Sequence, residues 1–238
     1  VPPQARFLAG VNIDSGGMGF QKEVKLSVPK PSNMPADAQP FVAQPSVHTN
    51  ADGTQEQVYV VHDSAKVVNG QLTTASPPFD GILGYGPFVF LFTPAPLNGP
   101  VVISGYTYRD MDGIGGYMPG PGENNDKPVK GAVIRSAAAY NLISYSKEDG
   151  HFAAYGFSTI DVCRSFATTA IHPQTMYKHT ANITTCDVPY IVNNFNFRLA
   201  DRNTQLPDTT APIITMNMQV VPGQADNPRF TAGTVPIN

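Results

Sequence analysis

Four acidic residues lie close together in the sequence and carry the side chains that a calcium ion prefers. Asp110 and Asp112 stand two residues apart before Gly113, and Glu123 and Asp126 follow after a short loop. Ca²⁺ takes six to eight oxygen ligands, and a glycine after Asp-x-Asp lets backbone carbonyls turn toward the ion. These four residues are therefore candidate ligands of a Ca²⁺ cofactor. The commoner explanation of such a pattern is a solvated turn whose aspartates bond their own backbone.

Three tyrosines flank the same loop and are candidates for binding a ligand. The chain has ten tyrosines, thirteen phenylalanines and no tryptophan. Sugar-binding surfaces use flat aromatic faces, and because tryptophan offers the largest face, its absence weighs against a strong carbohydrate site. Tyr106, Tyr108 and Tyr117 are left to stack on a ligand. We expect them to line a site for a cell-surface glycan or protein.

The two cysteines, Cys163 and Cys186, enclose a polar, threonine-rich segment that has little means of packing itself. In an oxidising compartment a disulfide between them closes a loop of about 23 residues, for which the chain-entropy model suggests on the order of 3 kcal/mol. The alternative is a pair of unrelated buried thiols in a cytosolic protein. Asn182 begins a glycosylation sequon, Asn-Ile-Thr, inside this loop, although such triplets also arise by chance. With the start Val1-Pro2-Pro3, typical of a processed chain, these features predict a secreted, extracellular glycoprotein.

Two histidines are candidates for acid–base chemistry. His62 and His151 stand at the ends of predicted strands, and either can act as a general base where a carboxylate or hydroxyl meets it in space. A lone histidine at a strand end is more often a capped or solvated residue. Glycine motifs for phosphate, Cys/His spacing for zinc and the GxSxG nucleophile turn are absent from the sequence. The catalytic residues of an enzyme of this sequence therefore stay unassigned.

Composition limits the partners of the chain. Charged residues make up 14% of the 238 residues and the net charge is −3, which argues against a basic surface for a nucleic-acid backbone. No apolar run approaches the roughly 18 to 20 residues that a membrane span needs. The 23 prolines and 21 glycines, together with 41% apolar residues, indicate many turns between short strands rather than disorder.

These patterns predict an all-β fold that positions the candidate residues. We expect a two-sheet antiparallel β-sandwich of jelly-roll or related Greek-key type, with little helix, as a single domain over residues 1–238. Long loops are expected at about 29–53 and 110–128. The central hairpin is expected from Pro87–Phe92 and Val101–Tyr108, two apolar runs bounded by turn residues.

Other strands follow from alternating polarity and from turn residues. Ala5–Ile13 and Phe20–Val28 are expected to pair as a first hairpin. Asn69-Gly70 supplies the positive-φ residues of a tight hairpin turn. Ser136–Ser144, which contains three alanines, is the segment where a short helix is most favoured. Further strands are expected at 129–135, 151–159, 188–199 and 213–221.

Three functions fit the sequence, and its chemistry favours the first. The first is a secreted, non-catalytic binding or structural protein that acts at a cell-wall, matrix or particle surface. The second is a secreted hydrolase or lyase that acts on a polysaccharide or ester through a site assembled from distant strands. The third is a jelly-roll coat protein, whose expected basic arm is missing. Low charge and the lack of a convincing catalytic set favour the binding protein, and the oligomeric state is left open.

Overall fold

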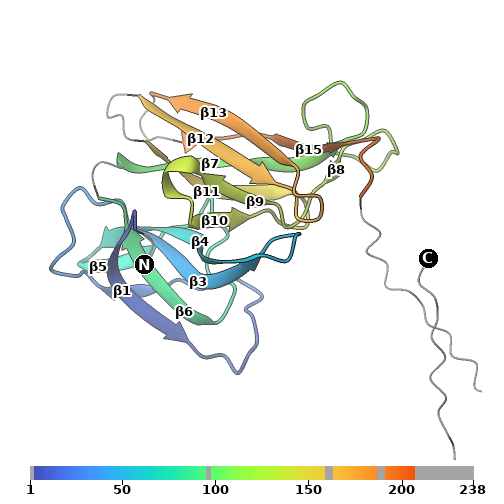
Figure 1. Ribbon diagram of the computed structural model, residues 1–238. Coiled ribbons are helices and arrows are strands. Elements are labelled where there is room, and N and C mark those ends of the chain that lie inside the picture. The colour runs from blue at the N-terminus through green and yellow to red at the C-terminus, as the bar shows by residue number, and fades with distance from the viewer. Residues whose placement is uncertain (1–2, 95–97, 159–162, 187–190, 207–238) are drawn as a thin grey trace, which may run out of the picture. The chain divides into compact units, whose positions relative to one another are not determined.

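The computed structural model describes residues 3–94, 98–158, 163–186 and 191–206 (Figure 1). Residues Val1–Pro207 form one compact unit. The strand expected at 213–221 lies outside the described residues, and so does the C-terminal part of the single domain expected over 1–238.

The described chain consists mainly of β-strands arranged in two sheets, which confirms the prediction of an all-β sandwich. The larger sheet has the order β1-β6-β3-β4-β10-β9-β12-β13, with β5 paired to β4 and β2 paired to β5. Its strands are β1 (Arg6–Ile13), β2 (Ser27–Pro29), β3 (Phe41–Thr49), β4 (Gln55–Val68), β5 (Gln71–Thr74), β6 (Gly86–Phe92), β9 (Val133–Ser136), β10 (Leu142–Tyr145), β12 (Arg164–Ile171) and β13 (Lys178–Thr185). In the smaller sheet β7 (Asn98–Asp110) pairs with β8 (Lys127–Pro128), β11 (His151–Ser158), β14 (Ile191–Val192) and β15 (Phe197–Asp201). Among the described residues the helical part is a 3-10 turn, η1 (Ala137–Ala139), within the segment where a short helix is predicted.

The two sheets pack against each other across an apolar core. Strand β11 of the smaller sheet contacts β9, β10 and β12 of the larger one. One core cluster joins Ile103 of β7, Ile134 of β9, Phe152 of β11, Phe166 of β12 and Phe197 of β15. Because side chains alternate along a strand, one face of each of these strands supplies the core. Full burial of each such side chain stabilises the folded state by about 1.5–3 kcal/mol.

The sheets are mixed, which corrects the expectation of a purely antiparallel sandwich. Strand β10 runs parallel to β4, and β14 and β15 both run parallel to β7. Parallel neighbours cannot be joined by a tight turn, so the chain reaches each of them through a long crossover. Turn residues in the sequence therefore give no sign of these pairings.

The predicted central hairpin is wrong, because its two strands belong to different sheets. Strand β6 lies between β1 and β3 in the larger sheet, whereas β7 lies in the smaller sheet beside β11. Phe88, Phe90 and Leu91 of β6 are fully buried, as are Val101 and Ile103 of β7. Both runs are apolar enough for any core position, so their composition predicts strands but does not choose their partners.

The predicted first hairpin and the first long loop also need correction. Strand β1 pairs with β6, and β2 pairs with β5, so the two segments of the expected hairpin do not pair with each other. The loop expected over 29–53 contains strand β3, which the sequence analysis missed because the segment holds five prolines and no periodic apolar pattern. Pro45 lies beyond the residues that pair with β6, where β3 is hydrogen-bonded to β4 alone. Proline is tolerated there because its nitrogen has no ladder partner to satisfy.

The turn at Asn69-Gly70 and the strand beginning at His151 are confirmed. Asn69 and Gly70 have φ angles of 49° and 74° and join β4 to β5, with Val68 opposite Gln71. Two successive positive-φ residues are the mark of the type I′ hairpin turn that an Asn-Gly pair favours.

Asp63 of β4 is a carboxyl group buried inside the fold, and it makes stability depend on pH. Its side chain is 1% exposed, Ser76 Oγ donates to Oδ2 at 2.6 Å, and Oδ1 has no hydrogen-bond partner among the described residues. Burial raises the pKa of Asp63 from 3.8 to about 6. Because the pKa is raised in the folded state, the contribution of Asp63 to stability is complete below about pH 3.8 and is lost as the pH rises to about 6.

We therefore expect Asp63→Asn to stabilise the protein at pH 7. The amide is never charged, so the free energy of unfolding of the variant should exceed that of the wild type by on the order of 2–3 kcal/mol at pH 7 and should equal it below pH 4. Urea unfolding of both proteins between pH 3.5 and 7.5 measures this difference, with the exposed Asp37→Asn as control. A difference that does not change with pH would show that Asp63 titrates normally.

Candidate functional site

The candidate tyrosines and three of the four candidate acidic residues meet where β7 ends. Tyr106, Tyr108 and Asp110 occupy alternate positions of β7, so they share one side of the strand. The loop of residues 111–126 then returns to β8, whose Lys127 and Pro128 pair with Arg109 and Tyr108. This return brings Tyr117 and Asp126 to the same place. We call Tyr106, Tyr108, Tyr117, Asp110, Asp112 and Asp126 the β7-end site.

Tyr117 contacts both of the other tyrosines of this site. The ring of Tyr117 stacks on Tyr106 with centroids 4.7 Å apart and lies 5.4 Å from the ring of Tyr108. The Tyr117 hydroxyl donates to the carbonyl of Asp149 at 3.3 Å. Burial raises the pKa of both Tyr108 and Tyr117, so their hydroxyls stay protonated at neutral pH. Tyr108 is buried, whereas Tyr106 and Tyr117 are half-buried, so the stack fixes the loop and leaves only part of its surface for a ligand.

Three of the four predicted acidic residues come together beside the tyrosines. One carboxylate oxygen from each of Asp110, Asp112 and Asp126 lies within 4.8 Å of the other two. Asp110 and Asp126 are 1% exposed, and Asp112 is half-buried. Glu123 is exposed and lies outside this group. These three oxygens are half or fewer of the six to eight that a calcium ion takes.

Backbone amides already donate hydrogen bonds to several carboxylate oxygens of these three aspartates. Asp110 Oδ1 accepts from the amide of Gly113 at 2.6 Å, and Asp112 Oδ1 accepts from Ile114 at 2.8 Å. Both oxygens of Asp126 accept backbone hydrogen bonds, from residues 111 and 118. These are the bonds of the solvated turn that the sequence analysis weighed against calcium. Asp112 Oδ2 and Asp110 Oδ2 accept no backbone amide among the described contacts.

Arg198 of β15 joins this group to a neighbouring cavity. Its register partner is Tyr108, and its Nη1 lies 3.2 Å from Asp110 Oδ2, within ion-pair distance but without a good hydrogen-bond angle. The cavity has a volume of about 340 Å³ and lies between β13 and the segment 198–204. Its lining consists of Tyr177, His179, Arg198, Leu199, Ala200, Asp201 and Thr204. Sequence reasoning missed this lining because the parallel pairing of β15 with β7 has no local signal.

The two candidate histidines lie in different surroundings. The ring of His151, at the start of β11, meets Tyr106 edge-on at 5.4 Å and so extends the tyrosine stack. His62 of β4 packs edge-on against Phe88, and its Nε2 has no hydrogen-bond partner among the described residues. Burial lowers the pKa of His62, so its ring is neutral at pH 7. Among the residues that the structure describes, neither histidine is hydrogen-bonded to a nucleophile, and the catalytic residues remain unassigned.

A second polar group, which the sequence analysis did not find, lies on the larger sheet. We call it the Arg135 cluster, and it consists of His48 (β3), Glu56 (β4), Arg135 (β9), Tyr140 and Tyr145 (β10). Arg135 is 3% exposed and donates to both oxygens of Glu56, at 3.2 and 2.7 Å, while the Tyr140 ring lies 4.3 Å from its guanidinium carbon. His48 Nδ1 and the Tyr145 hydroxyl are 2.9 Å apart. Hydrogen bonds from Arg135 hold the pKa of Glu56 below its usual range, which keeps the pair ionised.

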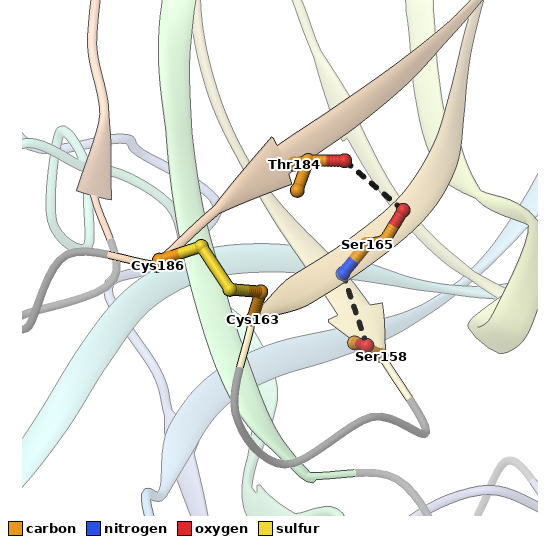
Figure 2. The surroundings of a disulfide bond; sticks show 5 residues. All are labelled: Ser158, Cys163, Ser165, Thr184 and Cys186. Carbon is orange, nitrogen blue, oxygen red and sulfur yellow. Dashed lines mark hydrogen bonds between the residues drawn. A yellow bond between two sulfur atoms is a disulfide. The ribbon is translucent and has the colours of Figure 1, made fainter.

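The predicted disulfide between Cys163 and Cys186 is present (Figure 2). It ties the residue before β12 to the residue after β13, the two antiparallel strands of one hairpin. On the same hairpin the Thr184 hydroxyl donates a hydrogen bond to the Ser165 hydroxyl at 3.1 Å, and the backbone amide of Ser165 donates one to the Ser158 hydroxyl (Figure 2). Asn182, the first residue of the sequon, is exposed on β13.

No helix of the described part of the chain has both the length and the apolar character needed to cross a bilayer. In comparisons with known proteins, no family model matches this chain, and no curated protein or solved structure is significantly similar to it.

Proposed function

We propose that this chain is a secreted, non-catalytic binding protein that acts at a cell-wall, matrix or particle surface, and that its partner is a cell-surface glycan or protein. The observation that carries the proposal is the convergence, at the end of β7, of a tyrosine stack, a carboxylate group and a polar cavity. Binding sites characteristically combine a concave surface, aromatic side chains and a few fixed polar groups.

The hydrogen bonds of the site favour holding a ligand over moving protons. The carboxylates accept from backbone amides that cannot give up a proton, and the tyrosine hydroxyls stay protonated. The disulfide supports an oxidising compartment, and the exposed Asn182 is compatible with a glycan on the hairpin.

Cosedimentation with insoluble cell-wall polysaccharides and matrix preparations tests the proposal. We expect saturable binding by the wild type and at least a tenfold loss in Tyr117→Ala, because the loop 111–126 is stacked on β7 through that ring. Tyr85→Ala, which removes an exposed tyrosine elsewhere, is the matched control. Absence of binding to every preparation would refute the proposal, and release of soluble sugar or acid would favour the hydrolase or lyase instead.

We further propose that Asp110, Asp112 and Asp126 hold Ca²⁺, and we expect chelation to lower the melting temperature. The three carboxylates outnumber the one guanidinium, Arg198, that pairs with Asp110, so the group keeps a net negative charge. An ion that binds only the folded state adds about 2.7 kcal/mol at a hundredfold excess over its dissociation constant. Asp112→Asn should abolish the response to chelator without making the chelated protein less stable. Glu123→Gln, outside the group, should keep the response. Equal melting with chelator and with millimolar calcium, and a blank metal assay, would leave the loop as a solvated turn.

A further inference from the structure

The cavity between β13 and β15 has the size of a small-ligand site. Its volume of about 340 Å³ lies near the lower end of the range of ligand pockets, roughly 300–1,000 Å³. Tyr177, 55% exposed, stands at the cavity with one aromatic ring available, whereas Leu199 and Ala200 of the lining are buried, at 0% and 6% exposed. The size and the single aromatic wall suit one ring of a ligand rather than an extended protein segment.

Two oppositely charged groups face each other in this cavity without forming a hydrogen bond to each other. Arg198 Nη2 and Asp201 Oδ2 are 3.9 Å apart, beyond hydrogen-bond distance, and their side chains are 45% and 49% exposed. The pair therefore offers a donor and an acceptor to a third group between them. A hydroxyl can serve both, because it accepts one hydrogen bond and donates another.

Neighbouring groups hold both charges in place. Asp201 Oδ1 accepts from Thr204 Oγ1 at 3.0 Å and from the amide of Asn203 at 2.9 Å, which leaves Oδ2 for a ligand. The hydrogen bond from Thr204 is the main reason that the pKa of Asp201 is lowered, so the carboxylate is ionised at neutral pH. Arg198 is held from the other side by Asp110. Arg109 donates to the carbonyls of residues 201, 202 and 204 and fixes the turn that carries Asp201.

His179 adds a third oriented polar group. Its Nδ1 lies 3.2 Å from the carbonyl of Arg198, and its ring packs edge-on against Phe197 at 5.5 Å. A carbonyl only accepts, so Nδ1 carries the proton in this contact and Nε2 is the ring nitrogen left for a ligand. The polar groups of the cavity are thus positioned before any ligand arrives, which lowers the entropy cost of binding.

We propose that this cavity binds a neutral pyranose ring through two adjacent hydroxyls, with Arg198 and Asp201 as the recognising pair and Tyr177 against the apolar face of the ring. One cation and one anion balance each other, so a carboxylate or an ammonium ligand would leave one of them facing a like charge. Adjacent hydroxyls match both groups. This inference rests on the proposed function as a surface-binding protein, and it names the ligand chemistry of the same region.

Titration with methyl glycosides, followed by NMR and calorimetry, tests the inference. The probes are the methyl pyranosides of glucose, galactose and mannose and a 2-deoxy analogue, each up to about 100 mM, well above a millimolar Kd. We expect at least one glycoside to bind and to shift resonances of His179 and Tyr177, and we expect Asp201→Asn to weaken it tenfold or more. Asp52→Asn is the matched control, because Asp52 also accepts from a nearby threonine amide and hydroxyl in an exposed turn. Melting curves of both variants verify that they are folded.

The outcomes separate this inference from the proposed function. If the wild type sediments with surface preparations but no glycoside binds or competes, or if Asp201→Asn binds glycoside as well as the wild type, the pyranose inference is wrong and the surface function stands. If a glycoside binds through Asp201 but no surface preparation is bound, the inference stands and the proposed function fails. If neither binds, both are wrong.

Discussion

Glu56→Gln is expected to lower the free energy of unfolding by about 3–5 kcal/mol, the usual cost of removing one partner from a buried ion pair. Arg135 is 2% exposed in its side chain, and Glu56 is 23% exposed, so little solvent screens the pair. The substitution keeps the shape of the side chain but leaves the guanidinium charge buried without its carboxylate. The Tyr140 ring over Arg135 offsets only a small part of that loss.

A double-mutant cycle measures this effect. Urea unfolding is recorded for Glu56→Gln, for Arg135→Met and for the double variant, which should be more stable than the sum of the two single losses predicts, because no charge is left alone. Glu148→Gln is the matched control, since its partner Lys130 is 64% exposed and Glu148 is 80% exposed. An exposed pair of that kind contributes about 0–1 kcal/mol. If Glu56→Gln cost no more than Glu148→Gln, the pair would not be buried as described.

Gly105→Ala is expected to cost roughly 3 kcal/mol or more, because the added methyl group meets backbone atoms. A Cβ at Gly105 would lie 2.1 Å from the carbonyl oxygen of Phe195 and 2.6 Å from its carbon. No side-chain rotation relieves such a clash, and overpacking alone typically costs 1–3 kcal/mol. The backbone around Phe195 must therefore move away from β7.

The segment that has to move is tied to β7 on both sides of the glycine. The Ser104 hydroxyl donates to Asn193, the amide of Phe195 donates to the Ser104 carbonyl, and the amide of Tyr106 donates to Asn196, at 2.9, 3.0 and 3.0 Å. Displacing this segment breaks those bonds and shifts β15, which follows it and carries Arg198.

Thermal melting and glycoside titration of Gly105→Ala check both consequences. We expect a lower melting temperature and weaker glycoside binding. Gly84→Ala is the control, because a Cβ there has no atom within 4 Å and its φ angle is not positive. If Gly105→Ala and Gly84→Ala had the same melting temperature, that result would contradict the close approach of the Phe195 backbone to β7.

Local features of the sequence predicted those parts of the structure that depend on neighbouring residues. The apolar run Val101–Tyr108 predicted a strand that ends beside the acidic residues, and the Asn69-Gly70 pair predicted its turn. The two cysteines predicted the disulfide, but the segment between them does pack, because Phe166 and Ile183 lie in the core.

Strand partners and the second half of the site were beyond sequence reasoning. Whether β6 pairs with β7 or with β1 and β3 depends on the whole core, and either choice buries the same apolar residues. Arg198 and Asp201 come beside Asp110 through a parallel pairing between segments some ninety residues apart, and no tight turn with a sequence signature joins such strands. The partner of Arg135 is Glu56, which is equally remote in sequence.

The disulfide has a consequence for self-association of the protein. Strand β13 is the last strand of the larger sheet and, among the described strands, pairs only with β12, so one of its edges presents unpaired backbone groups. Such an edge is a template for a strand from another molecule, and exchange of a whole hairpin between molecules requires the hairpin to come loose first. Because Cys163 and Cys186 close the hairpin at the end opposite its turn, β13 cannot separate from β12 and offer both edges (Figure 2). The exposed Lys178 and Asn182 place polar side chains on this edge strand, and polar or charged side chains on an edge strand disfavour its pairing with another molecule.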